Sequence, residues 1–367
     1  MYIKHKWFYA SVFMLLVLTD LVFARQVQTA HLGSPLHILE NPGGINAIAF
    51  SMDGKILVSA SYDWPRGTNP ATSAKDCESK STLSIWDIKN DKLLHRIPIG
   101  TKIQSFAISP DSRIIASSNQ AYYPSRQQDK IQSDVRIWDL ESGKLKHTIH
   151  HYPSNDSGLA FSPDGETLAV GDSINGGERG QVIFLYDIKT WKQKNVLKGF
   201  EGGHISQIAF SPDGTLIAAE SVAGEVGIAD LSIWDVRTTR RLRYYSGDDM
   251  KTTPFGPMFF LDNDVLVWGE LSLDLKAPKG KFVSFFEDEE MTSIGLYSKG
   301  GKLMLFLNRN KPDILELWDV SQNKSEKRWQ GIGKNCNPYN PKACYSMNNK
   351  LLAIGDNHGK INVWLLR

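Results

Sequence analysis

The chain has 367 residues, of which 41% are hydrophobic and 22% are charged, enough for one large globular domain with a substantial core. Its formal net charge at pH 7 is +2, which argues against a nucleic-acid binder, because such proteins carry a strong basic surplus. No linker segment divides the sequence.

Residues 1–24 have the three parts of a secretory signal peptide. A basic start precedes an apolar run over 7–18, and Val22 and Ala24 occupy the small-residue cleavage positions. We therefore expect an exported protein, periplasmic or secreted, with residues 25–35 as a short lead and no stable membrane insertion after cleavage. An uncleaved membrane anchor is the alternative, which the shortness of the apolar run disfavours.

A hairpin phrase recurs along the rest of the chain. In IAFSPDGTLIAAES (208–221), an apolar strand leads into Ser-Pro-Asp-Gly and a second apolar strand follows. This tetrapeptide suits a type I turn, because proline presets φ at the second position. Similar or looser copies occur at 48–61, 106–119, 159–172, 296–308 and 344–356.

A second phrase, such as LSIWDV (231–236), follows each hairpin and predicts a third strand. Its aromatic and acidic residues are Trp86, Asp87, Trp138, Asp139, Tyr186, Asp187, Trp234, Asp235, Trp318, Asp319 and Trp364. The successive aromatics are 52, 48, 48, 84 and 46 residues apart, so one unit is hidden in the long interval. We place it at 257–286, where LSLDL (271–275) lacks the tryptophan and follows a tight turn at Gly269 and Glu270.

Units of this length, with short strands and a Trp-Asp signature, are typical of propellers. On these hairpin and Trp-Asp phrases, residues 36–367 resemble the WD-repeat β-propeller family. The resemblance implies an all-β, seven-bladed β-propeller that acts as a scaffold. The last unit stops after its third strand, and LHILE (36–40) precedes the first hairpin. We expect residues 36–39 to pair beside 361–366 and close the ring.

Members of the family usually carry a Gly-His pair before the first strand of a repeat, and its histidine belongs to a tetrad of polar side chains. Here that pair occurs only at Gly203-His204, so the tetrad is mostly absent. We expect His204, Ser221, Asp230 and Trp234 to form it in blade 4, and apolar packing to replace it in the other blades.

The three cysteines allow one disulfide in an exported chain. Cys336 and Cys344 are nearest in sequence, and Cys77 with Cys336 is an alternative, because both lie in loops expected on one face of adjoining blades. Cys344 aligns with alanines of the other innermost strands, which favours a packed free thiol. The pairing stays open, and no zinc-binding spacing is present.

The sequence contains few patterns that indicate a catalytic site. Aligning the innermost strands places these residues near the channel mouth: Asn46, Gln104, Ser157, Ser206, Gly256, Ser293 and Pro341. None is acidic or histidine, and one step further back only Asp156 is a carboxylate, whereas metal-assisted hydrolysis needs several converging ligands. The strongest remaining cluster is His147, His150, His151 and Tyr152, for which we expect surface roles. We therefore predict a non-enzyme without metal or cofactor.

Loop length indicates where a partner binds, because the scaffold strands are occupied with packing. Between second and third strands, the longest loops are 62–82 in blade 1 and 120–134 in blade 2, against about ten residues in blades 3 and 4 and almost none in blade 5. Aromatics and arginine are enriched in binding hot spots, although such rings also fold long loops onto a scaffold. The candidate residues, three of them expected in the loop between blades 2 and 3, are Tyr62, Trp64, Arg66, Tyr122, Tyr123, Arg126, His150, His151 and Tyr152.

Two functions fit this pattern. The first is a non-enzymatic interaction module that binds a protein or peptide, and the family resemblance favours it. The second is a binder of glycans or small ligands that uses the same aromatics, with or without hydrolytic activity.

Overall fold

The repeated phrases form regular strands because each carries its own turn chemistry. In the hairpin of blade 4, Ser211 donates a hydrogen bond to Asp213 over 2.6 Å and accepts one from the amide of Leu216. The same serine–aspartate contact recurs in blades 1 to 3. In the Trp-Asp phrase, Asp235 accepts the amide of Thr238, which turns the chain into the fourth strand. Hydrogen bonds from Thr238 hold the pKa of Asp235 below its ordinary value.

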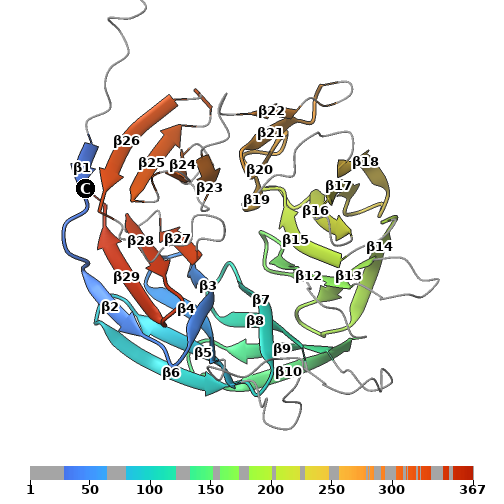
Figure 1. Cartoon of the computed structure of the whole chain (residues 1–367). Helices are drawn as coiled ribbons and strands as arrows, with labels where there is room; N and C mark the ends of the chain where they lie inside the picture. Colours follow the sequence, from blue (N-terminus) through green and yellow to red (C-terminus); the bar gives the residue numbers. More distant parts are fainter. Residues whose placement is uncertain are drawn as a thin grey trace, which may run out of the picture.

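The computed structural model describes residues 29–63, 80–120, 133–151, 158–172, 182–200, 204–223, 228–247, 256–277, 280, 282–284, 291–293, 303–308, 311, 313–319, 321–322, 324–331, 342–346 and 350–366. These residues form seven sheets arranged in a ring (Figure 1). The prediction of an all-β, seven-bladed β-propeller is confirmed.

Each blade is an antiparallel sheet whose first strand lies innermost and whose fourth lies on the outer wall (Figure 1). Blades 1 and 2 contain β3 (Gly44–Phe50), β4 (Ile56–Asp63), β5 (Lys80–Asp87), β6 (Lys92–Pro98), β7 (Lys102–Ile108), β8 (Ile114–Gln120), β9 (Ser133–Asp139) and β10 (Leu145–His151). Blades 3 and 4 contain β11 (Leu159–Phe161), β12 (Thr167–Asp172), β13 (Val182–Asp187), β14 (Gln193–Lys198), β15 (His204–Phe210), β16 (Leu216–Ala223), β17 (Ile228–Asp235) and β18 (Arg241–Tyr245). Blades 5 and 6 contain β19 (Met258–Phe260), β20 (Val265–Trp268), β21 (Leu271–Asp274), β22 (Phe282–Ser284), β23 (Met291–Ser293), β24 (Leu303–Asn308), β25 (Ile314–Asp319) and β26 (Lys324–Gln330).

Blade 5 is the hidden unit that the spacing of the aromatics predicts. Its four short strands lie within 257–286, and β20 and β21 are joined by Gly269 and Glu270 alone. Gly269 has φ of +56°, a left-handed conformation that glycine adopts without steric cost. The unit is therefore complete although its Trp-Asp pair is lost.

Blade 7 joins the two ends of the chain, as predicted. It combines β2 (His37–Glu40) with β27 (Lys342–Ser346), β28 (Leu351–Gly355) and β29 (Lys360–Leu365). β2 runs antiparallel to β29, with His37 opposite Val363 and Glu40 opposite Lys360. The early strand thus completes the last blade and closes the ring.

Blade 6 carries a fifth strand that the sequence patterns did not indicate. β1 (Thr29–His31) pairs in parallel with β26, and the amide of Leu32 continues the pairing to the carbonyl of Gln330 over 3.0 Å. The side chains of β1 are exposed, so main-chain hydrogen bonds hold most of this segment. Part of the expected lead is therefore a strand of the propeller.

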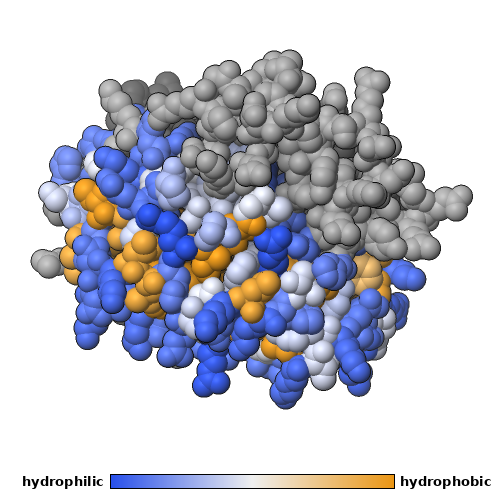
Figure 2. All heavy atoms as spheres, turned by 90° about the horizontal axis from the view of Figure 1, so that it is seen from below, coloured by the Kyte–Doolittle hydropathy of each residue, from blue (hydrophilic) through white to orange (hydrophobic). Residues whose placement is uncertain are grey.

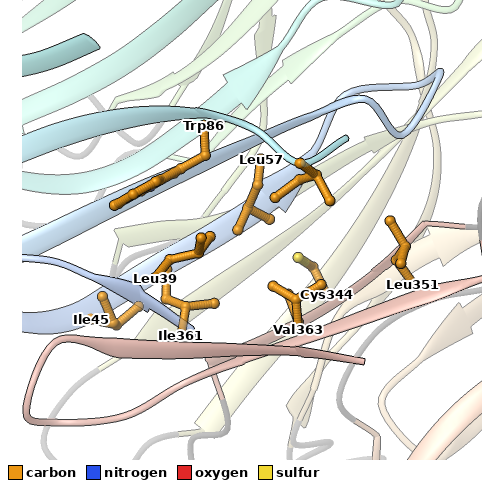
Figure 3. Close-up of a cluster of buried hydrophobic side chains, with 10 residues drawn as sticks. Leu39, Ile45, Leu57, Trp86, Cys344, Leu351, Ile361 and Val363 are labelled. Carbon is orange, nitrogen blue, oxygen red and sulfur yellow. The ribbon is translucent and has the colours of Figure 1, made fainter. Parts of the chain in front are cut away.

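The hydrophobic core is divided among the contacts between blades. Figure 3 shows the cluster between blades 7 and 1, in which Leu39 and Val363 face Leu57 and Trp86. Cys344 lies in this cluster as a buried free thiol, and burial raises its pKa well above the ordinary value. The packed-thiol interpretation of Cys344 is confirmed, whereas Cys77 and Cys336 lie outside the described residues.

The outer wall shows apolar side chains interrupted by hydrophilic ones (Figure 2). Its exposed large apolar residues include Ile38 in blade 7, Leu145 in blade 2 and Leu242 in blade 4. Exposed apolar residues scattered in this way are ordinary in soluble domains. A search of the described part of the chain finds no helix of the length and apolar character needed to span a membrane.

Candidate interaction surfaces

The loops between second and third strands all leave the propeller on one side, here called the loop face. The hairpin turns lie on the opposite side, here called the turn face. At the loop face, Tyr62 near the end of β4 pairs with Gly44 and Ser81. In blade 2, His151 at the end of β10 pairs with Ser133 at the start of β9. The candidate residues that the structure describes therefore lie on the same face.

Three predicted positions need correction. Tyr62 lies within β4, which runs to Asp63, and is half-buried. His150 and His151 belong to β10 rather than to the loop between blades, because that strand continues to pair along β9, where His150 lies opposite Asp134. The His150 side chain is exposed. The remaining candidates lie outside the described residues: Trp64, Arg66, Tyr122, Tyr123, Arg126 and Tyr152.

The strand bounds also revise the predicted loop lengths. The connection in blade 1 covers 64–79, that in blade 2 covers 121–132, and that in blade 3 covers 173–181. In blade 4 it is only 224–227, because β16 and β17 extend their pairing to Ala223 and Ile228. The longest connections still belong to the neighbouring blades 1 and 2.

A polar cluster fixes the base of the blade 2 loop. Asn119 donates to the Asp134 carboxylate over 3.0 Å, and Arg136 Nε donates to its other oxygen over 3.1 Å. Arg136 also donates to the carbonyl of Ile99, which comes from the end of blade 1. The sequence patterns did not indicate this cluster, although an aspartate four residues before the tryptophan recurs at Asp230. Both ends of the loop are thereby held against blade 1.

The polar pattern around the tryptophans differs from the prediction. In blade 4, Trp234 donates to the carbonyl of Lys198 over 3.1 Å rather than to Ser221, and Asp230 accepts Tyr244 and the amide of Gly247. The predicted tetrad is therefore wrong as a hydrogen-bonded chain through Trp234. The indole instead links blade 4 to the end of blade 3.

Blades 1 and 2 contain the tryptophan–serine contact that we expected to be absent there. Trp86 donates to Ser59 over 3.0 Å, and Ser59 donates to Asn41 over 2.9 Å. Trp138 likewise donates to Ser117 over 2.9 Å. Buried indole groups need such acceptors, so apolar packing alone does not account for these blades.

Blade 6 uses a carboxylate in the same role. Trp318 donates to Glu316 over 3.2 Å, and Arg328 on β26 approaches the other oxygen of Glu316 at 2.7 Å. Arg328 is also the residue of β26 that pairs with Thr29 on β1. β1 therefore pairs with a part of β26 whose Arg328 side chain is fixed by Glu316.

A buried carboxylate organises the contact between blades 4 and 5. Glu220 on β16 accepts Ser206 over 2.6 Å and Gln207 over 2.8 Å. Gln207 in turn donates to the carbonyl of Gly256 and accepts the amide of Met258. The glutamine side chain thus hydrogen-bonds the first strand of blade 5 as a neighbouring strand would. Ser206, one of the predicted channel positions, therefore contacts Glu220 within blade 4.

Comparison with known proteins agrees with this architecture. The family model described as WD domain, G-beta repeat matches residues 33–64 and 191–224. The first range covers the outer strand of blade 7 and the first two strands of blade 1, and the second covers parts of blades 3 and 4. The chain is a WD-repeat β-propeller. Each match contains one hairpin phrase, at 48–61 and at 208–221, and ends before the Trp-Asp phrase of that blade.

Several WD-repeat proteins are similar over part of this propeller. WD repeat-containing protein SL1-17 of Schistosoma mansoni is 29% identical over 29% of this chain and 33% of its own length. Target of rapamycin complex subunit wat1 of Schizosaccharomyces pombe is 33% identical over 30% of this chain and 32% of its own. The uncharacterized WD repeat-containing protein sll1491 of Synechocystis is 29% identical over 53% of this chain and 46% of its own. The chain thus spans from a third to under half of these relatives.

The WD-repeat blades are also joined by histidines on their outer strands. His37, His95 and His147 each pair with the residue just before the repeat tryptophan of their own blade. Each contacts the turn of the next blade: His37 lies 3.2 Å from Asp91, His95 lies 2.6 Å from the carbonyl of Glu141, and His147 stacks on Trp191. His147 therefore contacts blade 3, whereas His150 on the same strand is exposed. Within the described part of the propeller, no group of three or more His, Cys, Asp or Glu could hold a metal ion.

Proposed function

We propose that this WD-repeat propeller is a non-enzymatic scaffold that binds a protein or peptide through the loop face of blades 1 to 3. The observation that supports this proposal most directly is that the two longest connections between second and third strands, 64–79 and 121–132, begin and end on one face of neighbouring blades. Asp134 fixes the base of the second, and His150 is exposed beside it. WD-repeat propellers typically act as interaction scaffolds, and a rigid ring with uneven loops suits that role.

Partner capture tests this proposal. The full exported chain serves as bait, and the same chain with Trp64→Ala or Tyr123→Ala serves as the comparison. Each change should weaken binding of the captured protein by about 2 kcal/mol or more, as expected for a central aromatic anchor. Thermal melting should stay nearly unchanged.

Met52→Ala is a matched control, because Met52 is 68% exposed in a hairpin turn on the turn face. We expect this variant to retain full binding. Loss of folding in the Trp64 and Tyr123 variants without selective loss of binding would assign the loops to the scaffold. Binding on a glycan array, with no protein captured, would support the alternative of a carbohydrate-binding propeller.

We also propose that the protein is exported, on the strength of the signal-peptide pattern in residues 1–24. N-terminal sequencing of the protein from the extracytoplasmic fraction should begin near Arg25. A soluble cytosolic protein that retains Met1 would overturn the proposal.

A further inference from the structure

The outer edge of one blade already accepts an extended segment. β1 adds to β26 through main-chain pairing over Thr29–His31, and its own side chains stay exposed. Pairing of this kind needs an open strand edge and little side-chain burial. In the described part of the chain, the outer strands of the other blades are likewise the last strands of their sheets.

Among them, β18 in blade 4 has the most distinctive side chains. It is the last strand of its sheet, and no described strand pairs beyond it. Arg240 precedes it, Arg241 and Arg243 lie on it, and Leu242 between them is 42% exposed. The edge therefore combines three cations with one apolar side chain.

The neighbouring blade extends this positive charge. β14 lies next to β18 on the outer wall (Figure 1) and carries Lys194 and the exposed Lys198. Segments 187–199 and 235–245 together contain eight cations and two carboxylates, whereas the whole chain has a net charge of only +2. The two segments thus carry a net charge of +6, although Lys189 and Lys194 already pair with Glu166 and Asp187.

One of these arginines is held in position by the fold. The guanidinium of Arg241 donates to the carbonyl of Gly199 at the end of blade 3, and it lies 4.8 Å from the ring centroid of Tyr244. Arg241 therefore joins the two blades, while Arg240 is exposed. The positive surface thus has a rigid base with at least one exposed cation.

We propose that the β18 edge binds an extended acidic segment of a partner protein, which pairs with the strand and places an apolar side chain on Leu242. Charges on an open edge oppose pairing with ordinary strands, so a segment of opposite charge is the one that this edge selects. The surface is distinct from the loop face, so the proposal stands independently of the function proposed above.

The neighbouring charges favour a short peptide over a long polyanion. Asp187 and Asp235 lie at the turn ends of blades 3 and 4, and Asp213 lies in a hairpin turn on the same face. A nucleic-acid duplex or an anionic membrane would extend over these carboxylates as well as over the cations, which weakens its attraction to the wall. A peptide aligned with β18 stays on the wall, and Leu242 suits its side chains better than it suits phosphates.

The test measures binding of a short synthetic peptide in which Glu alternates with Val, by fluorescence anisotropy with the full chain. Arg240→Glu combined with Arg243→Glu should weaken binding about tenfold or more, since each reversal replaces an attraction by a repulsion. Arg240→Glu alone should weaken peptide binding less than the double variant. Because Arg240 is exposed, this single variant keeps the test valid if the double variant does not fold. Amide hydrogen exchange in 241–245 should slow when the peptide is bound.

The matched control is Lys89→Glu combined with Lys92→Glu, which reverses two exposed cations in blade 1. We expect this variant to bind the peptide like the unchanged protein. The proposal would be overturned if the control variant bound the peptide as weakly as the arginine variant does. It would also be overturned if a peptide with Lys in place of Glu bound equally well, or if amide exchange in β18 did not change. Tighter binding of duplex DNA or of anionic vesicles through the same arginines would also overturn it.

Discussion

Ser59 and Ser84 lie opposite each other on β4 and β5, and both are fully buried. Ser59 accepts the indole of Trp86, whereas the Ser84 hydroxyl has no hydrogen-bond partner among the described residues. Ser59→Ala would leave the indole buried without its acceptor and should lower the free energy of unfolding by about 1–3 kcal/mol. Ser84→Ala, the control, removes an unpaired hydroxyl and should leave it unchanged or raise it. Equal losses in urea unfolding would contradict this assignment.

Burial in the folded state disfavours the charged form of Glu220. Burial raises its pKa, although hydrogen bonds from Ser206 and Gln207 act in the opposite direction. Because the folded pKa lies above the unfolded one, this group's contribution to stability is complete below the unfolded pKa and is lost as the pH rises through the folded pKa. Glu220→Gln should therefore stabilise the protein at pH 8 and have little effect at pH 4. Urea unfolding at both values tests this, and a greater loss of stability at pH 8 would contradict it.

At the scale of the elements, β10 is joined to the next blade by one of its two described histidine side chains. His147 stacks on Trp191 with ring centroids 5.4 Å apart and planes at 16°, whereas His150 on the same strand is exposed. His147→Ala should lower the free energy of unfolding by about 1 kcal/mol, the usual contribution of an aromatic pair. His150→Ala should leave it unchanged. Chemical unfolding compares the two variants, and equal effects would show that the stack does not stabilise the contact between blades 2 and 3.

For the whole molecule, closure of the ring depends on β2 more than on β1. β2 pairs with β29, and its Leu39 is 2% exposed within the core between blades 7 and 1. Deleting residues 33–40 should lower the melting temperature of the entire propeller, because an open blade exposes the core of its neighbour. Deleting residues 29–31 instead removes exposed side chains and should change melting little.

Calorimetry of the two deletion variants measures this difference. A cooperative transition at an unchanged temperature after loss of 33–40 would refute closure by β2. An equally large destabilisation after loss of 29–31 would show that β1 holds the ring as well.

The sequence by itself determined the four strands of each blade, the number of blades and the way in which the ring closes. These features follow from local chemistry within one unit: the Ser-Pro-Asp-Gly turns, the aspartate after four of the five repeat tryptophans, and the alternation of apolar residues. Even blade 5 was predictable without its tryptophan, because LSLDL keeps the strand pattern and Gly269 permits the tight turn. The surplus LHILE strand and the incomplete last unit together predicted closure.

Only the tertiary structure decided which groups meet across neighbouring strands and blades. Trp86 donates to Ser59, Trp234 to the carbonyl of Lys198, and Trp318 to Glu316, although all three tryptophans occupy the same place in the repeat. The pairing of β1 with β26 was equally hidden, because exposed strands lack an apolar pattern. Such contacts depend on the distance and tilt between blades, which are set by the packing of all seven around the ring and by no pattern within a single repeat.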